Sequence, residues 1–193
     1  VFFFVVGLEV KREWIEGQLS TAQSRRLPIL AAIAGPPMRD MLLKDGIKSS
    51  IVELRASLAR SRSEAIAQAY DVTICRSSDY ENCDTGSGDW SSGWISFLDK
   101  DGDAVRDAGE ALIDVHEAIS LSATLTLNEV VSGTDAKDFF QYNRQGLPGD
   151  VAGNPAQALF VLCPFDGDAG KARGLYINAT GRAGETRDTD NDG

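Results

Sequence analysis

Five carboxylates gather in the segment DKDGDAVRDAGE, which follows a short apolar run. They occupy positions one, three, five, nine and twelve of that segment, as Asp99, Asp101, Asp103, Asp107 and Glu110. This is the spacing of an EF-hand loop, in which carboxylate oxygens hold Ca²⁺. The spacing therefore makes Asp99–Glu110 the candidate calcium site of the chain.

The same segment departs from an EF-hand in two ways. Position six, which is normally Gly, is Ala104, and Gly102 stands at position four instead. The residues before it, Trp94–Leu98, have the composition of a strand, whereas an EF-hand loop follows a helix. The alternative interpretation is an acidic hairpin tip between two strands, and the sequence favours it.

The cysteines and the histidine give little further chemistry. Cys75 and Cys83 flank a polar segment and are placed to close a short disulfide loop in an oxidising compartment. The alternative is that these two and Cys163 are unrelated buried thiols. A zinc site is not expected with His116 as the one histidine and no CxxC pair. No GxSxG elbow accompanies that histidine, so nucleophilic catalysis is not expected either.

One long helix is predicted after the break at Pro36 and Pro37. Apolar residues recur there at spacings of four, three, four and seven, which places them on one face of a helix. They are Ile47, Ile51, Leu54, Leu58 and Ala65. We expect this face to pack against the core of the protein.

From Asp71 onward the pattern is that of strands. Six short runs are rich in β-branched, aromatic and Leu residues, with Gly, Ser, Asn and Asp between them. The runs are DVTICRS, GWISFLD, ALIDVHEA, SATLTLNEVV, ALFVLCPF and GLYINAT. A helix followed by strands with no helices between them predicts an α+β fold, with an N-terminal α-helix packed on an antiparallel β-sheet.

The order of these pieces resembles the GspH/FimT group of minor type IV pilins and type II secretion pseudopilins. The resemblance covers residues 36–193 and rests on the ordered set RSEAI, VTIC, WSSGWISF, VHEA and ATGR. It implies a stem helix over residues 36–70 and a β-rich head over residues 71–193. It also implies a structural subunit, not an enzyme, that assembles with other pilin subunits at the inner membrane and presents its head to the periplasm or on a filament. Such a compartment is oxidising and favours the Cys75–Cys83 bridge.

DNA-binding members of that group carry two arginines near the C-terminus, and here Arg182 and Arg187 are the corresponding candidates. The chain has a net charge of −10, so any DNA binding through them is expected to be weak and sensitive to salt. The alternative is that Gly181 takes a turn conformation and Arg182 ends a strand.

Residues 1–35 have another character and resemble a fragment of NhaA-type sodium/proton antiporters, most clearly in FFFVVGLEVKRE. In that family Glu9, Arg12 and Glu13 match positions of a pH-sensing region. The family's paired-aspartate transport site has no counterpart in this chain, so transport is not expected. We expect these residues not to form a folded domain, and to reflect a spliced or misassembled reading frame in which an antiporter fragment replaces a pilin leader. The alternative is a true fusion.

Overall fold

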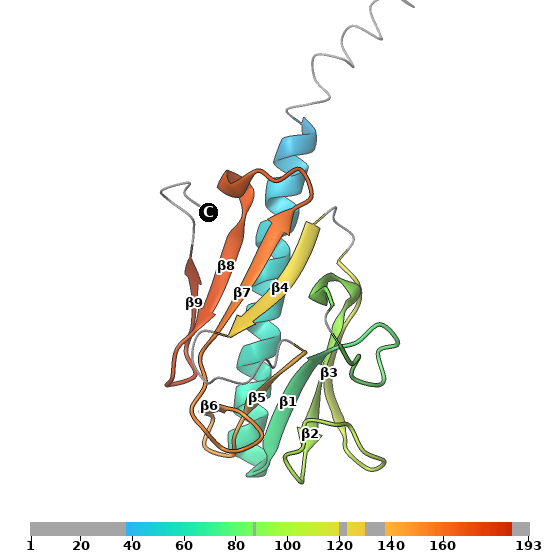
Figure 1. Cartoon of the computed structure of the whole chain (residues 1–193), viewed down its shortest axis with the longest axis vertical. Coiled ribbons are helices and arrows are strands. Elements are labelled where there is room, and N and C mark those ends of the chain that lie inside the picture. Colours follow the sequence, from blue (N-terminus) through green and yellow to red (C-terminus); the bar gives the residue numbers. More distant parts are fainter. Residues whose placement is uncertain (1–37, 87, 120–122, 130–137, 187–193) are drawn as a thin grey trace, which may run out of the picture. The chain divides into compact units, whose positions relative to one another are not determined.

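The computed structural model describes residues 38–86, 88–119, 123–129 and 138–186. The predicted antiporter-like segment and Arg187 lie outside the described residues. The chain from Leu43 onward forms one compact unit, and its helix runs along two sheets (Figure 1). No helix in the described ranges combines the length and the hydropathy that a membrane span needs.

The helix is described over residues 38–68, and its buried face is the predicted one. The five apolar residues of the predicted stripe are each at most 2% exposed, which confirms the periodicity argument. Ser57 and Ser61 lie on the same buried face, and the Ser61 hydroxyl donates to the Ser57 carbonyl oxygen over 2.9 Å. The helix ends before Ala69, whose φ of 59° is the left-handed conformation common just beyond a helix C-terminus.

The first sheet has five antiparallel strands in the order β3-β2-β1-β5-β6. They are β1 (Asp71–Arg76), β2 (Trp94–Asp99), β3 (Leu112–His116), β5 (Phe139–Tyr142) and β6 (Pro148–Gly149). The second sheet has four antiparallel strands in the order β4-β7-β8-β9. They are β4 (Ala123–Glu129), β7 (Ala158–Pro164), β8 (Arg173–Ile177) and β9 (Ala183–Thr186).

The predicted fold class, a helix packed on antiparallel β-structure, is confirmed, and each of the six predicted runs contains a strand. The strands divide between two sheets, and β5, β6 and β9 were not anticipated. A 3-10 turn, η1 (Trp90–Ser92), lies between β1 and β2, and another, η2 (Ala169–Lys171), lies between β7 and β8.

One hydrophobic core joins the helix to both sheets. Trp90 and Trp94 are 0% exposed, as expected of core aromatics. Trp90 packs edge-on against Phe160 of β7, with ring centroids 5.1 Å apart. Trp94 of β2 faces the helix, and its indole N–H donates to the Ser57 hydroxyl over 3.2 Å.

Candidate functional site

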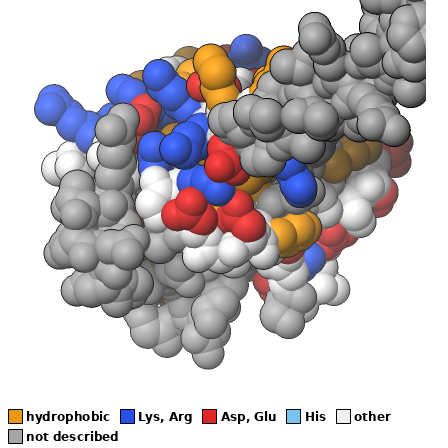
Figure 2. Space-filling model, turned by 90° about the horizontal axis from the view of Figure 1, so that it is seen from above, with side chains coloured by type: hydrophobic (Ala, Val, Ile, Leu, Met, Phe, Trp, Pro, Cys, Tyr) orange, Lys and Arg blue, Asp and Glu red, His pale blue; other side chains and the backbone are white. Residues whose placement is uncertain are grey.

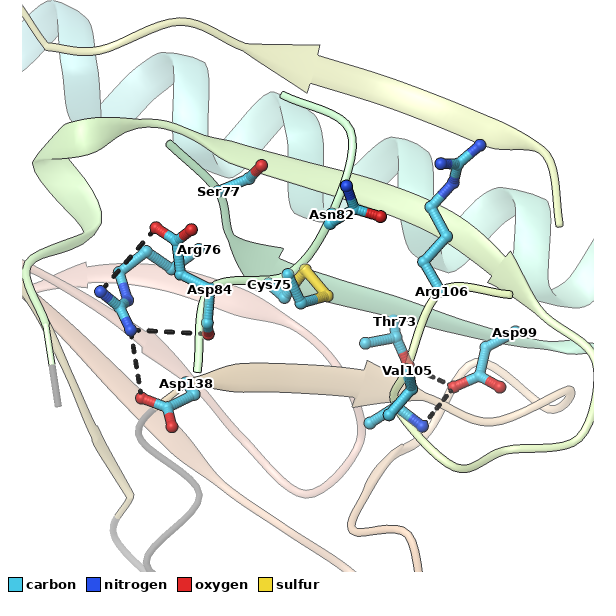
Figure 3. Close-up of a disulfide and its surroundings, with 12 residues drawn as sticks. Thr73, Cys75, Arg76, Ser77, Asn82, Asp84, Asp99, Val105, Arg106 and Asp138 are labelled. Carbon is cyan, nitrogen blue, oxygen red and sulfur yellow. Dashed lines mark hydrogen bonds and ion pairs between the residues drawn. A yellow bond between two sulfur atoms is a disulfide. The ribbon is translucent and has the colours of Figure 1, made fainter. Parts of the chain in front are cut away.

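The acidic loop is organised by Asp99, the last residue of β2, which is 0% exposed. Its Oδ1 accepts from the Gly102 N–H over 2.7 Å, and its Oδ2 accepts from the Ala104 N–H over 3.0 Å. Oδ2 also accepts from the Thr73 hydroxyl over 2.7 Å and from the Gln141 side-chain amide over 3.0 Å. A buried carboxylate with four donors holds the loop onto the centre of the first sheet. Figure 3 shows Asp99 beside Thr73, one of these donors.

Glu110 closes the other end of the loop in the same manner. It is 6% exposed, and its two carboxylate oxygens accept from the backbone N–H groups of Lys100 over 2.7 Å and Asp107 over 3.0 Å. In an EF-hand this final Glu gives both oxygens to the cation. Here both oxygens accept hydrogen bonds from the loop backbone.

Three of the five carboxylates come close to one another. Asp99, Asp101 and Asp103 each offer an oxygen within 4.8 Å of the others, whereas Asp107 and Glu110 are not part of this group. Asp101 and Asp103 are exposed. With one oxygen from each, three converging carboxylates supply fewer oxygens than the about six that Ca²⁺ takes. The structure therefore brings together three of the five predicted calcium ligands.

Cys75 and Cys83 are joined by a disulfide with a Cα–Cα distance of 5.5 Å, and Cys163 is free and half-buried. Burial raises the pKa of the Cys163 thiol. The disulfide fastens the residue 76–83 loop to β1. Cys75 itself is 0% exposed, at the middle of the first sheet.

Asp79 shapes the disulfide loop from within. Its Oδ1 accepts from the backbone N–H groups of Asn82 over 2.7 Å and Glu81 over 2.8 Å, and its Oδ2 accepts from the Asn82 side-chain amide over 2.9 Å. These bonds, led by those from Asn82, favour the charged carboxylate and hold the pKa of Asp79 well below its usual range.

Arg76, at the end of β1, binds the segment that follows this loop. Its guanidinium donates to the Gly86 carbonyl oxygen over 2.6 Å. It lies 3.9 Å from an oxygen of Asp84 and 3.7 Å from an oxygen of Asp138, and its side chain is 10% exposed (Figure 3). One cation is thus shared between two carboxylates.

The predicted DNA-contacting residue Arg182 is exposed and lies in the turn between β8 and β9. Asn178 begins that turn, and its side-chain oxygen accepts from the N–H of Thr180 and the N–H of Arg182, each over 3.0 Å. Gly181 has a φ of 76°, as the turn interpretation expected. Arg182 therefore lies directly before the first residue of β9.

Arg62 of the helix is a residue that the sequence did not single out. Its Nε donates to the Gly146 carbonyl oxygen and its NH2 group to the Thr180 carbonyl oxygen, each over 2.8 Å. One guanidinium therefore binds the β5–β6 loop of one sheet and the β8–β9 turn of the other. Arg62 is the first residue of RSEAI, and Thr180 lies in ATGR. Both segments belong to the set on which the pilin resemblance rests, and this was the one indication in the sequence that they are related.

His116 also joins the helix to a sheet. Its ring stacks on Trp94 with centroids 3.8 Å apart, and its Nε2 lies 3.0 Å from a carboxylate oxygen of Glu53. Next to it, Asp114 accepts from the Ser57 hydroxyl over 2.7 Å and pairs with Arg60 over 2.9 Å. These contacts fix one edge of the helix to β3.

None of the strands in the described residues lies against the opposite face of the helix. Small or β-branched residues recur there at spacings of three and four, and all of them are exposed: Ser49, Val52, Ala56, Ala59 and Ser63. Ile66 continues this face and is 53% exposed, and Tyr70, just beyond the end of the helix, is 46% exposed. Small side chains on one helix face allow the backbone of a second helix to approach closely. We refer to residues 49–63 of this surface as the outer helix face.

Comparison with known protein families gives two matches. The family model for the type II transport protein GspH matches residues 51–181. The model for the Na+/H+ antiporter 1 family matches residues 1–71. Both resemblances found in the sequence are thereby confirmed, and the two matches overlap along the helix.

Curated relatives match the antiporter-like part. The Na(+)/H(+) antiporter NhaA 2 of Novosphingobium aromaticivorans is 71% identical over 35 residues, and NhaA 1 of Erythrobacter litoralis is 74% identical over 35 residues. Each alignment covers 18% of this chain, which spans only 9% of the length of either relative.

A solved structure matches the other part. The crystal structure of the type IV minor pilin FimU from Pseudomonas aeruginosa has a TM-score of 0.52 and 21% sequence identity. The match covers 74% of this chain and 89% of that one. At this identity the match shows a common fold.

Proposed function

The chain belongs to the GspH family of type II transport proteins, and on that premise we propose that it is a minor pilin or pseudopilin. Its role would be structural: it assembles with other subunits of a type IV pilus or of a type II secretion pseudopilus. The family, the fold shared with FimU and the outer helix face support this proposal. We further propose that the full-length protein is held at the inner membrane with its β-rich head in the periplasm or on the filament surface.

The outer helix face is the observation that carries the proposal. The other side of the same helix is fully engaged by the two sheets, with Leu54 and Leu58 both 0% exposed. Val52, in contrast, is 49% exposed and lies among alanines and serines. A smooth face of this kind can be covered by a helix of a neighbouring subunit without displacing anything from the chain's own core.

Basic residues border this face. Lys44, Lys48 and Arg55 recur at spacings of four and seven, which places them along one side of the helix. Figure 2, which views the protein from above, shows several Lys and Arg side chains in the left half of that view, with Asp and Glu side chains among them. Arg55 lies 3.6 Å from Glu185 of β9, in an exposed ion pair. Such a border would orient an acidic partner along the helix.

The alternative functions have weaker support. For calcium binding, the carboxylates of Asp99, Asp101 and Asp103 converge, but Glu110 is occupied by backbone donors. For DNA binding, Arg182 is exposed, but the acidic chain opposes phosphate binding. We therefore place the assembly role first.

Photocrosslinking in a host that builds the filament tests the proposal. p-Benzoylphenylalanine is placed at Ala59 on the outer helix face, and at Ala108, an exposed residue of the acidic loop, as the control. We expect crosslinks to other filament subunits from Ala59 and few from Ala108. Equal yields from both positions would show that the outer helix face is not the contact.

A further inference from the structure

A groove lies beside the disulfide, between two loops that are far apart in the sequence. Its volume is about 290 Å³, just below the roughly 300 Å³ at which small-molecule sites begin. One wall is residues 82–85, at the end of the disulfide loop and just after it, and the other is residues 103–106 of the acidic loop. The disulfide itself and Phe139 of β5 also line it (Figure 3). A groove of this size accommodates one or two side chains.

The walls of the groove are held in place. The Cys75–Cys83 disulfide fixes one wall to β1. Arg106 ties the acidic loop to the disulfide loop, because its guanidinium donates to the Glu81 carbonyl oxygen over 2.9 Å. It also donates to the Glu110 carbonyl oxygen of its own loop over 3.2 Å. A groove that is already formed loses little conformational entropy when it is occupied.

The lining combines an apolar surface with an acidic rim. The apolar part is the disulfide, Ala104, Val105 and Phe139, and Val105 is 57% exposed. Three carboxylates also line the groove, those of Asp84, Asp103 and Asp138. Arg106 is the one cation among the described lining residues, and it donates to backbone carbonyls. Arg76, outside the lining, lies 3.9 Å from Asp84 and 3.7 Å from Asp138. Three carboxylates beside two guanidinium groups leave the edge of the groove with a net negative charge, and its inside is apolar.

We propose that this groove binds a lysine or arginine side chain from an exposed segment of a different protein subunit. The aliphatic stem of such a side chain packs on Val105, Phe139 and the disulfide. Its charged head reaches the carboxylate of Asp103 and shares that of Asp138 with Arg76. Long cationic side chains bury their methylene stems in this way and keep their charged ends at the solvent.

A second copy of the chain is a poorer occupant. The chain carries a net charge of −10, so two copies repel one another over the distances at which they meet. A basic partner is instead attracted by the negative charge of the chain. The groove and the outer helix face are formed by different elements, so the failure of one proposal leaves the other standing.

A peptide titration of the isotopically labelled 193-residue chain tests this inference. The probe is a short capped peptide with one lysine between two valines, and the control peptide has glutamine in place of lysine. We expect saturable shifts of the backbone amide signals of Val105, Arg106 and Phe139 with the lysine peptide, and a dissociation constant of about 1 mM or below. The glutamine peptide is expected to produce no saturation.

Variants of the rim complete the test. Asp103→Asn combined with Asp138→Asn should weaken binding of the lysine peptide about tenfold, because the attraction is between charges. Asp101→Asn, on the same loop but outside the groove, should bind as the parent chain does. The two rim variants are also measured singly, so that a folding defect in the double variant leaves the test intact.

Three results would overturn the inference. They are shifts that never saturate, equal binding of the lysine and glutamine peptides, or an equal loss of binding in the Asp101→Asn variant. Sedimentation of the concentrated protein gives a further outcome. A dimer that the two rim substitutions abolish would assign the groove to a second copy and contradict the proposal of a different subunit.

Discussion

The Arg62 guanidinium lies 2.8 Å from the carbonyl oxygen of Thr180, at a sequence separation of 118 residues. The same group donates to the Gly146 carbonyl oxygen over 2.8 Å. Because these acceptors belong to loops of different sheets, a single helix residue links the stem to both halves of the head. A charged donor with two backbone acceptors is among the stronger kinds of protein hydrogen bond.

We therefore expect Arg62→Ala to lower the free energy of unfolding by about 1.5 kcal/mol, because both carbonyl groups lose a charged donor. The matched control is Arg55→Ala, which removes an exposed ion pair with Glu185 on the same helix and should change stability by less than about 0.5 kcal/mol. Urea unfolding measures both. Equal losses in the two variants would show that Arg62 has no special role.

Gly181 provides a second test of the same junction. Its φ is 76°, and a Cβ added there would lie 2.5 Å from the Gly146 carbonyl oxygen. Gly181→Ala should therefore destabilise the protein by about 2 kcal/mol. Gly184→Ala is the control, since a Cβ at Gly184 meets nothing within 4 Å, and we expect a change within about 0.5 kcal/mol. If urea unfolding shows that neither substitution lowers the free energy of unfolding, the close approach of Gly181 to the Gly146 carbonyl oxygen is contradicted.

The stability contributed by Asp79 should depend on pH in a defined direction. Its pKa is lowered in the folded protein, chiefly by the hydrogen bonds from Asn82, and so lies below the unfolded value of about 3.9. The contribution is present above that value and is lost as the pH falls toward the folded pKa. The melting temperature of the parent chain should therefore exceed that of Asp79→Asn at neutral pH, and the difference should narrow below about pH 4. A difference that is constant or widens on acidification would contradict this assignment.

Calcium should have little effect on the protein. The Glu110 oxygens accept from the Lys100 and Asp107 N–H groups and do not join the three converging carboxylates. We expect millimolar Ca²⁺ to shift the melting temperature by less than about 1 °C. A rise of several degrees that Asp101→Asn abolishes would show instead that the acidic loop is a calcium site.

Local patterns in the sequence were sufficient for much of the fold. The helix was predictable because Ile47, Ile51, Leu54 and Leu58 repeat with its period and bury one face. The strands that were missed are short: β5 has four residues, β6 has two and β9 has four. The sequence of β9, AGET, has no apolar alternation, since this strand lies at the edge of its sheet. A strand such as β9 is specified by its neighbours and not by its own residues, whereas β5, with the sequence FFQY, has residues typical of strands and was missed because it is short.

The candidate sites were less predictable, because they depend on contacts between distant residues. The spacing of Asp99 and Glu110 fits a calcium loop, yet both carboxylates accept hydrogen bonds from within the protein. Spacing alone cannot distinguish these two uses of a carboxylate. Arg62 gave no local signal, since its acceptors lie 84 and 118 residues away in the chain. The acidic groove likewise forms only when the disulfide loop meets the acidic loop.

Assembly of the filament itself tests the central claim most directly. Ala59→Glu places a charge on the outer helix face without touching the buried side of the helix, and Ala108→Glu places the same charge on the exposed acidic loop. Both variants should remain folded, as checked by melting temperature. We predict that filaments or secretion in the host are lost with Ala59→Glu and retained with Ala108→Glu. Normal assembly with a folded Ala59→Glu protein would contradict the assignment of this face as the subunit contact.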